Sequence, residues 1–207
     1  MNPKPIVMAS IGLTLIAGGA TFVALKAMIP QEAQSGVIQA APERTAKVPP
    51  KFQLENQLGE KVSLDQLQGK VVMLTAVYAT CHTACPTIIT KAKAAAKRLT
   101  PEQQADLSIV AITLDPKGDT QDKRQMAAKA HELAPPLFHY VNGDDPEVVL
   151  DLIKELGWAR AEGPDGVIGH SNLFLLVDRQ GTIAFTVSAD GEGDELDRRL
   201  ATLLAEK

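Results

Sequence analysis

An apolar run at residues 70–77, KVVMLTAV, leads almost directly to the chain's only two cysteines, Cys81 and Cys85. A continuous apolar run of this length predicts a strand that is buried on both faces. Pro86 follows the second cysteine and suits the first turn of a helix, where its missing N–H costs nothing. The sequence therefore predicts a core strand that delivers both cysteines to the start of a helix.

Further segments alternate between strand and helix patterns along the rest of the chain. We expect a hairpin at 52–54 and 62–64, helices at 86–99, 120–133, 146–156 and 194–205, and strands at 107–114, 138–141, 172–178 and 182–187. Alternating strands and helices that end in a second hairpin predict an α/β fold with a thioredoxin-like mixed sheet, flanked by helices. In such a fold, the functional site is expected at the carboxyl end of the first core strand.

The N-terminal segment 6–25 contains no charged residue. Twenty helical residues span ~30 Å, the thickness of the hydrocarbon core of a bilayer. We therefore predict a single transmembrane anchor with its flanks at 1–30. Lys4 and the free amine favour a cytoplasmic N-terminus, which places the soluble domain on the periplasmic, extracytoplasmic side of the inner (plasma) membrane. A cleaved signal peptide is the main alternative, and a buried core helix is another.

Residues 31–50 show no hydrophobic period and include several prolines, which predicts a flexible linker between the anchor and a domain at 51–207. Charged residues make up 22% and apolar residues 45% of the chain, as in globular proteins. The net charge is −4, and no run of Lys or Arg occurs. An acidic chain of this kind lacks the electrostatic pattern of a nucleic-acid-binding protein.

The spacing of the cysteines allows two kinds of chemistry. On one face of a helix, residues four apart have Cα atoms ~6 Å apart, which permits a disulfide or a shared metal ion. The start of a helix favours thiolates, and thiolates select Cu(I), zinc or iron–sulfur clusters. Two thiolates are too few for a cluster and leave a zinc site half complete. Because Cu(I) tolerates low coordination, Cys81, Cys85 and one imidazole would suffice for it.

Four histidines are candidates for that imidazole. His82 lies between the cysteines and is expected to point away from them, while His131 and His139 fit exposed or structural positions in a helix and a short strand. His170 lies in a glycine-bearing loop, GVIGHSN, just before an apolar strand. A loop at this place in the fold can return over the helix start, so we select His170.

Three motifs together carry a resemblance to a known family. They are Cys81-x-x-x-Cys85-Pro86, Asp115-Pro116-x-x-Asp119-Thr120 and the late His170. With these motifs the sequence resembles the Sco/SenC family, membrane-anchored copper proteins of cytochrome c oxidase assembly. The resemblance implies copper held by Cys81, Cys85 and His170, with Asp115 as a supporting residue. Asp119 is interpreted as a cap or turn residue.

The resemblance also implies partners and a function. The partner would be the copper-site subunit of cytochrome c oxidase, with another copper chaperone or a thiol reductase as further partners. The chain would act as a metallochaperone that delivers copper, as Cu(I) and with Cu(II) left open, to the dinuclear copper centre. A copper chaperone is favoured over an enzyme, although a thiol–disulfide reductase activity stays open.

As a thiol–disulfide oxidoreductase, the protein would use Cys81 to attack and Cys85 to resolve the mixed disulfide. The CxxxC spacing weakens this alternative, because thioredoxin-type enzymes usually carry CxxC. A peroxidase is disfavoured because Thr80 is adjacent to Cys81. A purely structural disulfide explains little, since so short a loop hardly restricts the unfolded chain.

Overall fold

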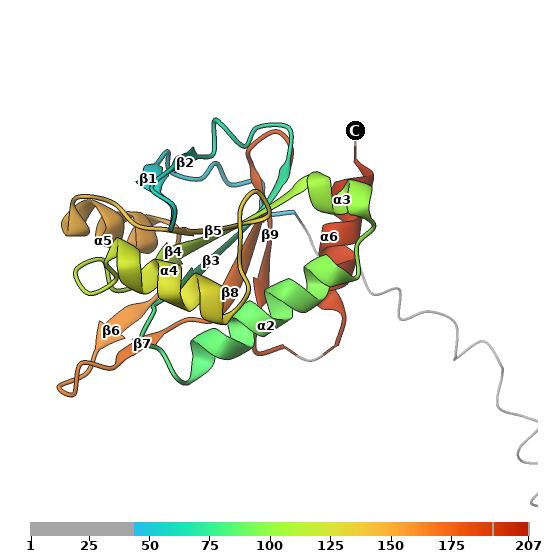
Figure 1. Ribbon diagram of the computed structural model, residues 1–207. Coiled ribbons are helices and arrows are strands. Elements are labelled where there is room, and N and C mark those ends of the chain that lie inside the picture. Colours follow the sequence, from blue (N-terminus) through green and yellow to red (C-terminus); the bar gives the residue numbers. More distant parts are fainter. Residues whose placement is uncertain (1–43, 192, 207) are drawn as a thin grey trace, which may run out of the picture. The chain divides into compact units, whose positions relative to one another are not determined.

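The computed structural model describes residues 44–191 and 193–206. Its central sheet has five strands in the order β5-β4-β3-β8-β9 (Figure 1). These strands are β3 (Val71–Val77), β4 (Leu107–Thr113), β5 (Phe138–Val141), β8 (Leu173–Val177) and β9 (Ile183–Ser188). The first three run parallel, while β8 pairs antiparallel with β3, and β9 antiparallel with β8. The predicted mixed sheet is confirmed.

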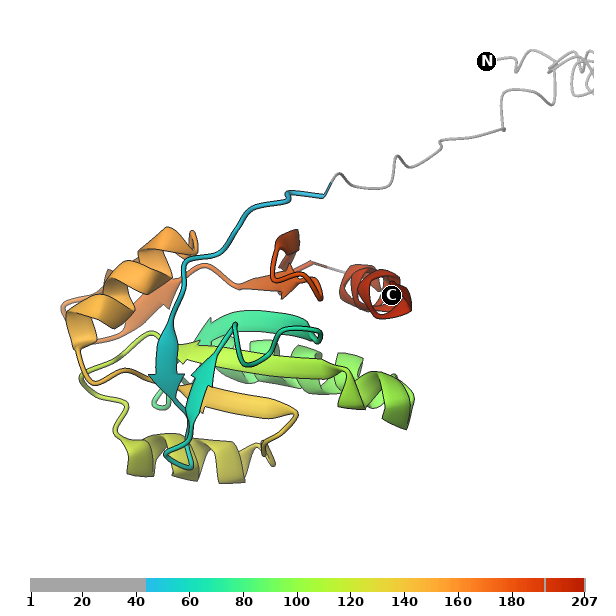
Figure 2. The same cartoon turned by 90° about the horizontal axis from the view of Figure 1, so that it is seen from above.

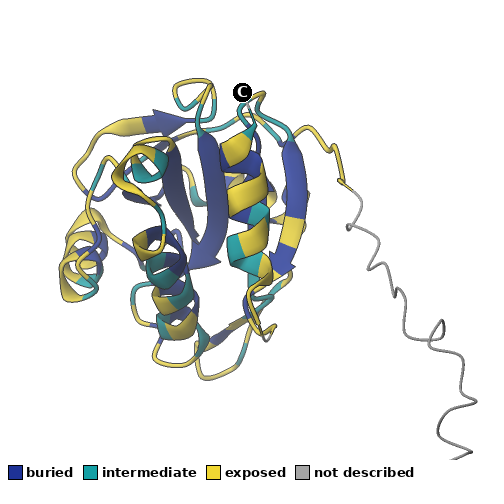
Figure 3. Ribbon diagram, turned by 90° about the vertical axis from the view of Figure 1, so that its right-hand side faces the viewer, coloured by how far each residue is buried: buried dark blue, intermediate teal, exposed yellow. Residues whose placement is uncertain are grey.

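Helices cover this sheet, as expected. They are α2 (Ala84–Lys97), α3 (Pro101–Ala105), α4 (Gln121–Ala130), α5 (Pro146–Glu155) and α6 (Glu195–Ala205). Every residue of β3 and β4 is buried, because α2 lies on one side of the sheet and the first hairpin on the other (Figures 1 and 2). Figure 3 shows the contrast between the buried strands and the exposed outer faces of the helices. The apolar runs therefore form the core.

The N-terminal hairpin, β1 (Gln53–Glu55) and β2 (Lys61–Ser63), forms its own two-stranded sheet. Its turn protects the edge of β5, because Gln57 Oε1 accepts a hydrogen bond from Tyr140 N at 2.8 Å and Gln57 Nε2 donates to Phe138 O at 3.3 Å. A paired or covered edge does not recruit other strands. The hairpin turn thus covers the free edge of β5.

Two helix predictions need correction. The helix predicted to reach residue 133 ends at Ala130, because Glu132 adopts a positive φ of 56° and Leu133 N donates back to Ala128 O. No helix was predicted directly after residue 99, yet the short helix α3 starts at Pro101. Thr100 accepts from Gln103 N and Thr100 N donates to the Gln103 side chain, which makes a capping box.

The loop expected around His170 is also different. It is a second small hairpin, formed by β6 (Arg160–Glu162) and β7 (Ile168–His170). Its strands carry few apolar residues, and only Ile168 on β7 is buried, so the hydrophobic pattern gave no indication of them. His170 therefore comes from a strand, whose backbone is better fixed than that of a loop.

The predicted anchor at 6–25 lies outside the described residues. Among the residues that the structure describes, no helix combines the length and apolarity that a bilayer crossing requires. At the described end of the predicted linker, Thr45 N donates to Ala184 O and Lys47 pairs with Ile183 beside β9. The boundaries of anchor, linker and domain remain predictions.

Candidate metal centre

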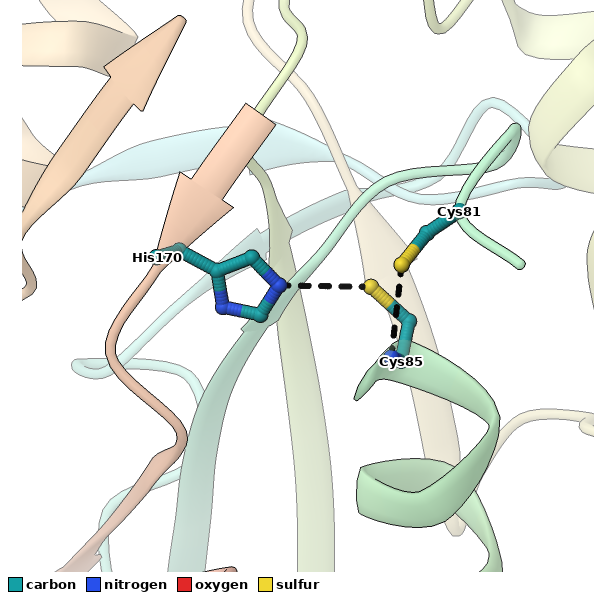
Figure 4. Close-up of side chains that lie close together, drawn as sticks. All are labelled: Cys81, Cys85 and His170. Atoms are coloured by element: carbon teal, nitrogen blue, oxygen red, sulfur yellow. Dashed lines mark hydrogen bonds between the residues drawn. The ribbon is translucent and has the colours of Figure 1, made fainter. Parts of the chain in front are cut away.

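A histidine that is distant in the sequence meets the two neighbouring cysteines at the carboxyl end of β3. The ligand atoms of Cys81, Cys85 and His170 all lie within 4.8 Å of one another (Figure 4). The Cys85 Sγ and His170 Nε2 atoms are 3.6 Å apart. Cys81 comes from the turn after β3, Cys85 from the first turn of α2, and His170 from the end of β7. The expected return of the His170 segment over the helix start is thus present.

The spacing of the cysteines suggested that they share one face of a helix, but Cys81 lies before the helix. Helix α2 begins at Ala84, and Cys81 N donates to Tyr78 O in the turn that precedes it. The N-cap residue Thr83 makes no side-chain capping bond. Instead, Cys85 N donates to Cys81 Sγ at 3.3 Å, so the sulfur accepts a hydrogen bond from the helix N-terminus. The turn before α2 therefore brings the two sulfurs together, and the i, i+4 spacing of a helix does not.

The two thiols have unlike environments, although both are buried. Burial opposes ionisation of Cys81, but hydrogen bonds from Cys85 and from the Thr83 backbone outweigh it, and the pKa of Cys81 is lowered. Burial is the main reason that the pKa of Cys85 is raised far above its ordinary value, and its hydrogen bond to Cys81 adds to the effect. Cys81 is therefore the thiol that ionises first.

The imidazole of His170 is oriented by its second nitrogen. Nδ1 lies 3.2 Å from Ser171 O, a contact that fits a protonated Nδ1 and leaves the Nε2 lone pair facing Cys85. The ring of Tyr78 meets the imidazole edge-on, with centroids 6.2 Å apart. A backbone acceptor on the far nitrogen is the usual way in which proteins orient a metal-binding histidine.

Asp119 is a residue whose importance the sequence interpretation missed. It is fully buried and accepts hydrogen bonds from Thr113 Oγ1 at 2.6 Å, Tyr140 OH at 2.5 Å and Ala79 N at 3.0 Å. Burial raises the pKa of its carboxyl group. Of the two interpretations, the cap is wrong because Thr120 caps α4, whereas the turn is correct because Asp119 N donates to Asp115 O. Asp119 instead fixes the turn that leads into Cys81.

Asp115, the predicted supporting residue, lies in the loop after β4. Its Oδ1 accepts from Gly118 N at 2.9 Å. A Cβ at Gly118 would lie 1.9 Å from Asp115 Oδ2, so the carboxylate closes tightly over this glycine. Asp115 does not belong to the group of three close ligand atoms found among the described residues. Support of the loop and contact with a partner both remain predicted roles of Asp115.

The remaining histidines lie elsewhere. His139 is buried between Asn56 Nδ2 at 3.2 Å and Pro136 O at 3.1 Å, as expected of a structural histidine. His82 is exposed and His131 is the C-cap residue of α4. Of the four histidines, His170 is the one in the described group with both cysteines.

The donor set fits a soft metal ion. Metal–sulfur bonds of ~2.3 Å and metal–nitrogen bonds of ~2.0 Å, at tetrahedral or trigonal angles, put a sulfur and a nitrogen ligand roughly 3.5–3.7 Å apart. The observed separation of 3.6 Å between Cys85 Sγ and His170 Nε2 agrees with this range. Thiolates and imidazole suit Cu(I) and zinc, and no carboxylate that would favour a hard ion belongs to the group.

The fold and these side chains define a thioredoxin-like protein with a thiol–imidazole site at the end of its first core strand. More specifically, the chain belongs to the SCO1/SenC family, whose family model matches residues 40–205. The SCO2-like protein of Rickettsia typhi is 28% identical over 184 residues, which cover 86% of each chain. The resemblance seen in the sequence is confirmed.

Solved structures show the same fold. A SCO1/SenC family lipoprotein from Bacillus anthracis superposes with a TM-score of 0.69 at 20% identity, covering 78% of this chain and 98% of that chain. The ScoI protein of Bradyrhizobium japonicum, solved with copper bound, gives a TM-score of 0.62 at 22% identity, covering 75% and 99%. At identities of 20% and 22%, these comparisons show that the fold is shared.

Proposed function

We propose that this chain is a copper-binding metallochaperone for the dinuclear copper centre of cytochrome c oxidase. Cys81, Cys85 and His170 hold the copper as Cu(I). The observation that carries this proposal is the convergence of two sulfurs and one imidazole nitrogen within 4.8 Å. Family membership and the copper bound to the ScoI structure of Bradyrhizobium japonicum support it.

The site is suited to release of the ion as well as to binding. Three protein ligands leave room for an incoming sulfur from a partner, so the partner's ligands enter while the donor's ligands leave. Cys81 Sγ accepts a hydrogen bond from Cys85 N, which favours the thiolate form of Cys81. Cys85 must give up its proton when the ion binds, because the thiolate is the ligand.

Thiol–disulfide exchange is the second candidate function, and the unequal pKa values of the two cysteines favour it. The Cys81 thiolate would attack a disulfide in the copper-site subunit and form a mixed disulfide, releasing one partner thiolate. Cys85, after losing its proton, would then attack Cys81 and release the second partner thiolate. Two electrons pass to the partner, which gains two thiols, and Cys81 and Cys85 become a disulfide.

A transfer experiment separates the two functions. The Cu(I)-loaded full chain is mixed with the copper-site subunit in its reduced form. In a second arm, the reduced, metal-free chain is mixed with the subunit whose cysteines are joined as a disulfide. A metallochaperone transfers copper to the reduced subunit, as measured by mass spectrometry. A reductase without bound copper converts the disulfide form to free thiols. If neither copper nor thiols appear on the subunit, both functions are wrong.

We also infer that residues 6–25 anchor the domain to the membrane, with the copper site on the extracytoplasmic side. The support is the uncharged stretch of twenty residues and the basic N-terminal flank. Cell fractionation tests the inference. The full chain should remain with the membranes after a high-salt wash, whereas a chain found in the soluble fraction would contradict an anchor.

A further inference from the structure

A hydrogen bond connects the β6–β7 hairpin, which carries His170, to the end of β4, the strand that pairs with β3. Arg160 Nε donates to Leu114 O at 2.7 Å, and Arg160 lies opposite His170 in the β6–β7 register. We propose that Arg160 is a positioning residue, which sets the distance between His170 and the cysteines through Leu114. This inference rests on the proposed function, because it concerns the same three ligands.

Leu114 provides a fixed point for this bond. It follows β4 directly and is fully buried. Its N–H donates to Val77 O at 2.8 Å, and Val77 is the last residue of β3, four positions before Cys81. Leu114 therefore bonds through its N–H to the cysteine-bearing strand and through its carbonyl to Arg160. Because close-packed interiors leave little room for movement, this carbonyl has a defined position.

The hairpin that carries His170 is a separate two-stranded sheet, not hydrogen-bonded as a strand to the central one. Ile168 anchors it by an apolar contact, since this side chain is buried. Apolar contacts are non-directional and permit small shifts. The Arg160 bond is directional and short, so it selects one position of the hairpin relative to β4.

Arg160 also forms an ion pair, but this pair does not hold the hairpin against the rest of the domain. Its Nη2 contacts Glu162 Oε2 at 2.9 Å, within the same strand. Because this contact stays inside the hairpin, it cannot fix the hairpin to the rest of the domain. The side chain of Arg160 is 20% exposed and that of Glu162 is 56% exposed. Glu162 therefore offers a matched control that touches Arg160 without touching Leu114.

Two substitutions test the bond to Leu114. Arg160→Met keeps a long apolar stem but removes every donor, and Arg160→Lys keeps one donor. The control, Glu162→Gln, removes the ion pair alone. Cu(I) affinity is measured on the full chain by competition with a chelator, and X-ray absorption reports the nitrogen ligand. Loss of a residue that orients a metal ligand typically lowers affinity about 10-fold to 100-fold.

We expect Arg160→Met to bind Cu(I) about 10-fold to 100-fold more weakly and to lose the nitrogen ligand from the X-ray absorption spectrum. Arg160→Lys should recover part of the affinity and part of the nitrogen signal. Glu162→Gln should match the wild type in both measurements. Circular dichroism verifies folding; if Arg160→Met does not fold, Arg160→Lys is compared with Glu162→Gln, and equal affinities overturn the inference. An Arg160→Met variant that binds like the wild type also overturns it. If His170→Ala binds like the wild type, the proposed ligand set itself is wrong, which is a distinguishable result.

Discussion

The imidazole Nε2 of His170 lies 3.6 Å from the sulfur of Cys85, although the two residues are 85 positions apart in the chain. The contact depends on two local structures, the first turn of α2 and the hairpin β6–β7. Both meet at the carboxyl end of β3, the place where ligands bind in sheets of this kind. The fold thus brings a distant histidine to a close pair of cysteines and makes one soft donor set.

The two cysteines should react at different rates with an alkylating reagent. The pKa of Cys81 is lowered, that of Cys85 is raised, and the thiolate is the reactive form. Brief treatment of the reduced, metal-free chain with iodoacetamide near neutral pH should label Cys81 first. Peptide mapping by mass spectrometry identifies the labelled residue. Faster labelling of Cys85 would contradict the described thiol environments.

His139 should make the protein less stable in mild acid. Burial lowers the pKa of this imidazole below its ordinary 6.5, so the unfolded chain binds a proton at a pH where the folded one does not. The free energy of unfolding should therefore fall as the pH drops below 6.5, by at most about 1.4 kcal/mol per pH unit for one proton. Above that pH, His139 should contribute no slope.

Urea unfolding at several pH values measures this effect. His139→Gln removes the titrating group and should flatten the curve between the ordinary pKa of histidine and the lowered one. His82→Gln is the control, because it makes the same substitution at an exposed histidine. An unaltered slope in His139→Gln would assign the acid sensitivity to other groups.

Asp119 and Asp115 should differ in their importance for stability. In Asp119→Asn, an amide group replaces one carboxylate oxygen. In place of Oδ2 it removes the acceptor of Thr113 and Tyr140, and in place of Oδ1 it turns a donor toward the N–H of Ala79. A buried donor without a partner costs about 1–3 kcal/mol. In thermal or urea unfolding, Asp115→Asn should cost less, because Asp115 is only half-buried. Equal losses for both variants would refute the central role assigned to Asp119.

The core of the fold could be predicted from the sequence because its signals are local. The apolar run of β3, the proline after Cys85 and the helical spacing in α5 each depend on residues close in the chain. His170 was found by its place before the strand β8 and by resemblance to a family. Local pattern and motif thus located all three members of the group.

The rest depends on partners that are distant in the sequence. Asp119 looks like an ordinary turn residue until Tyr140 and Ala79 are known to surround it. Polar residues inside apolar strands, such as Thr113 and Tyr140, were the available signal that a buried acceptor lies nearby. Arg160 gave no such signal, because its acceptor is a backbone carbonyl, and every residue has one whatever its side chain.

The most direct test of the copper site compares Cu(I) binding by the wild-type chain, His170→Ala and His82→Ala. All three are reduced, and affinity is measured by anaerobic competition with a chelator. Wild type and His82→Ala should bind one Cu(I) with equal affinity, and His170→Ala should bind at least about 10-fold more weakly with its two thiols intact. Equal binding by all three variants, or no binding by the wild type, would contradict a centre built from Cys81, Cys85 and His170.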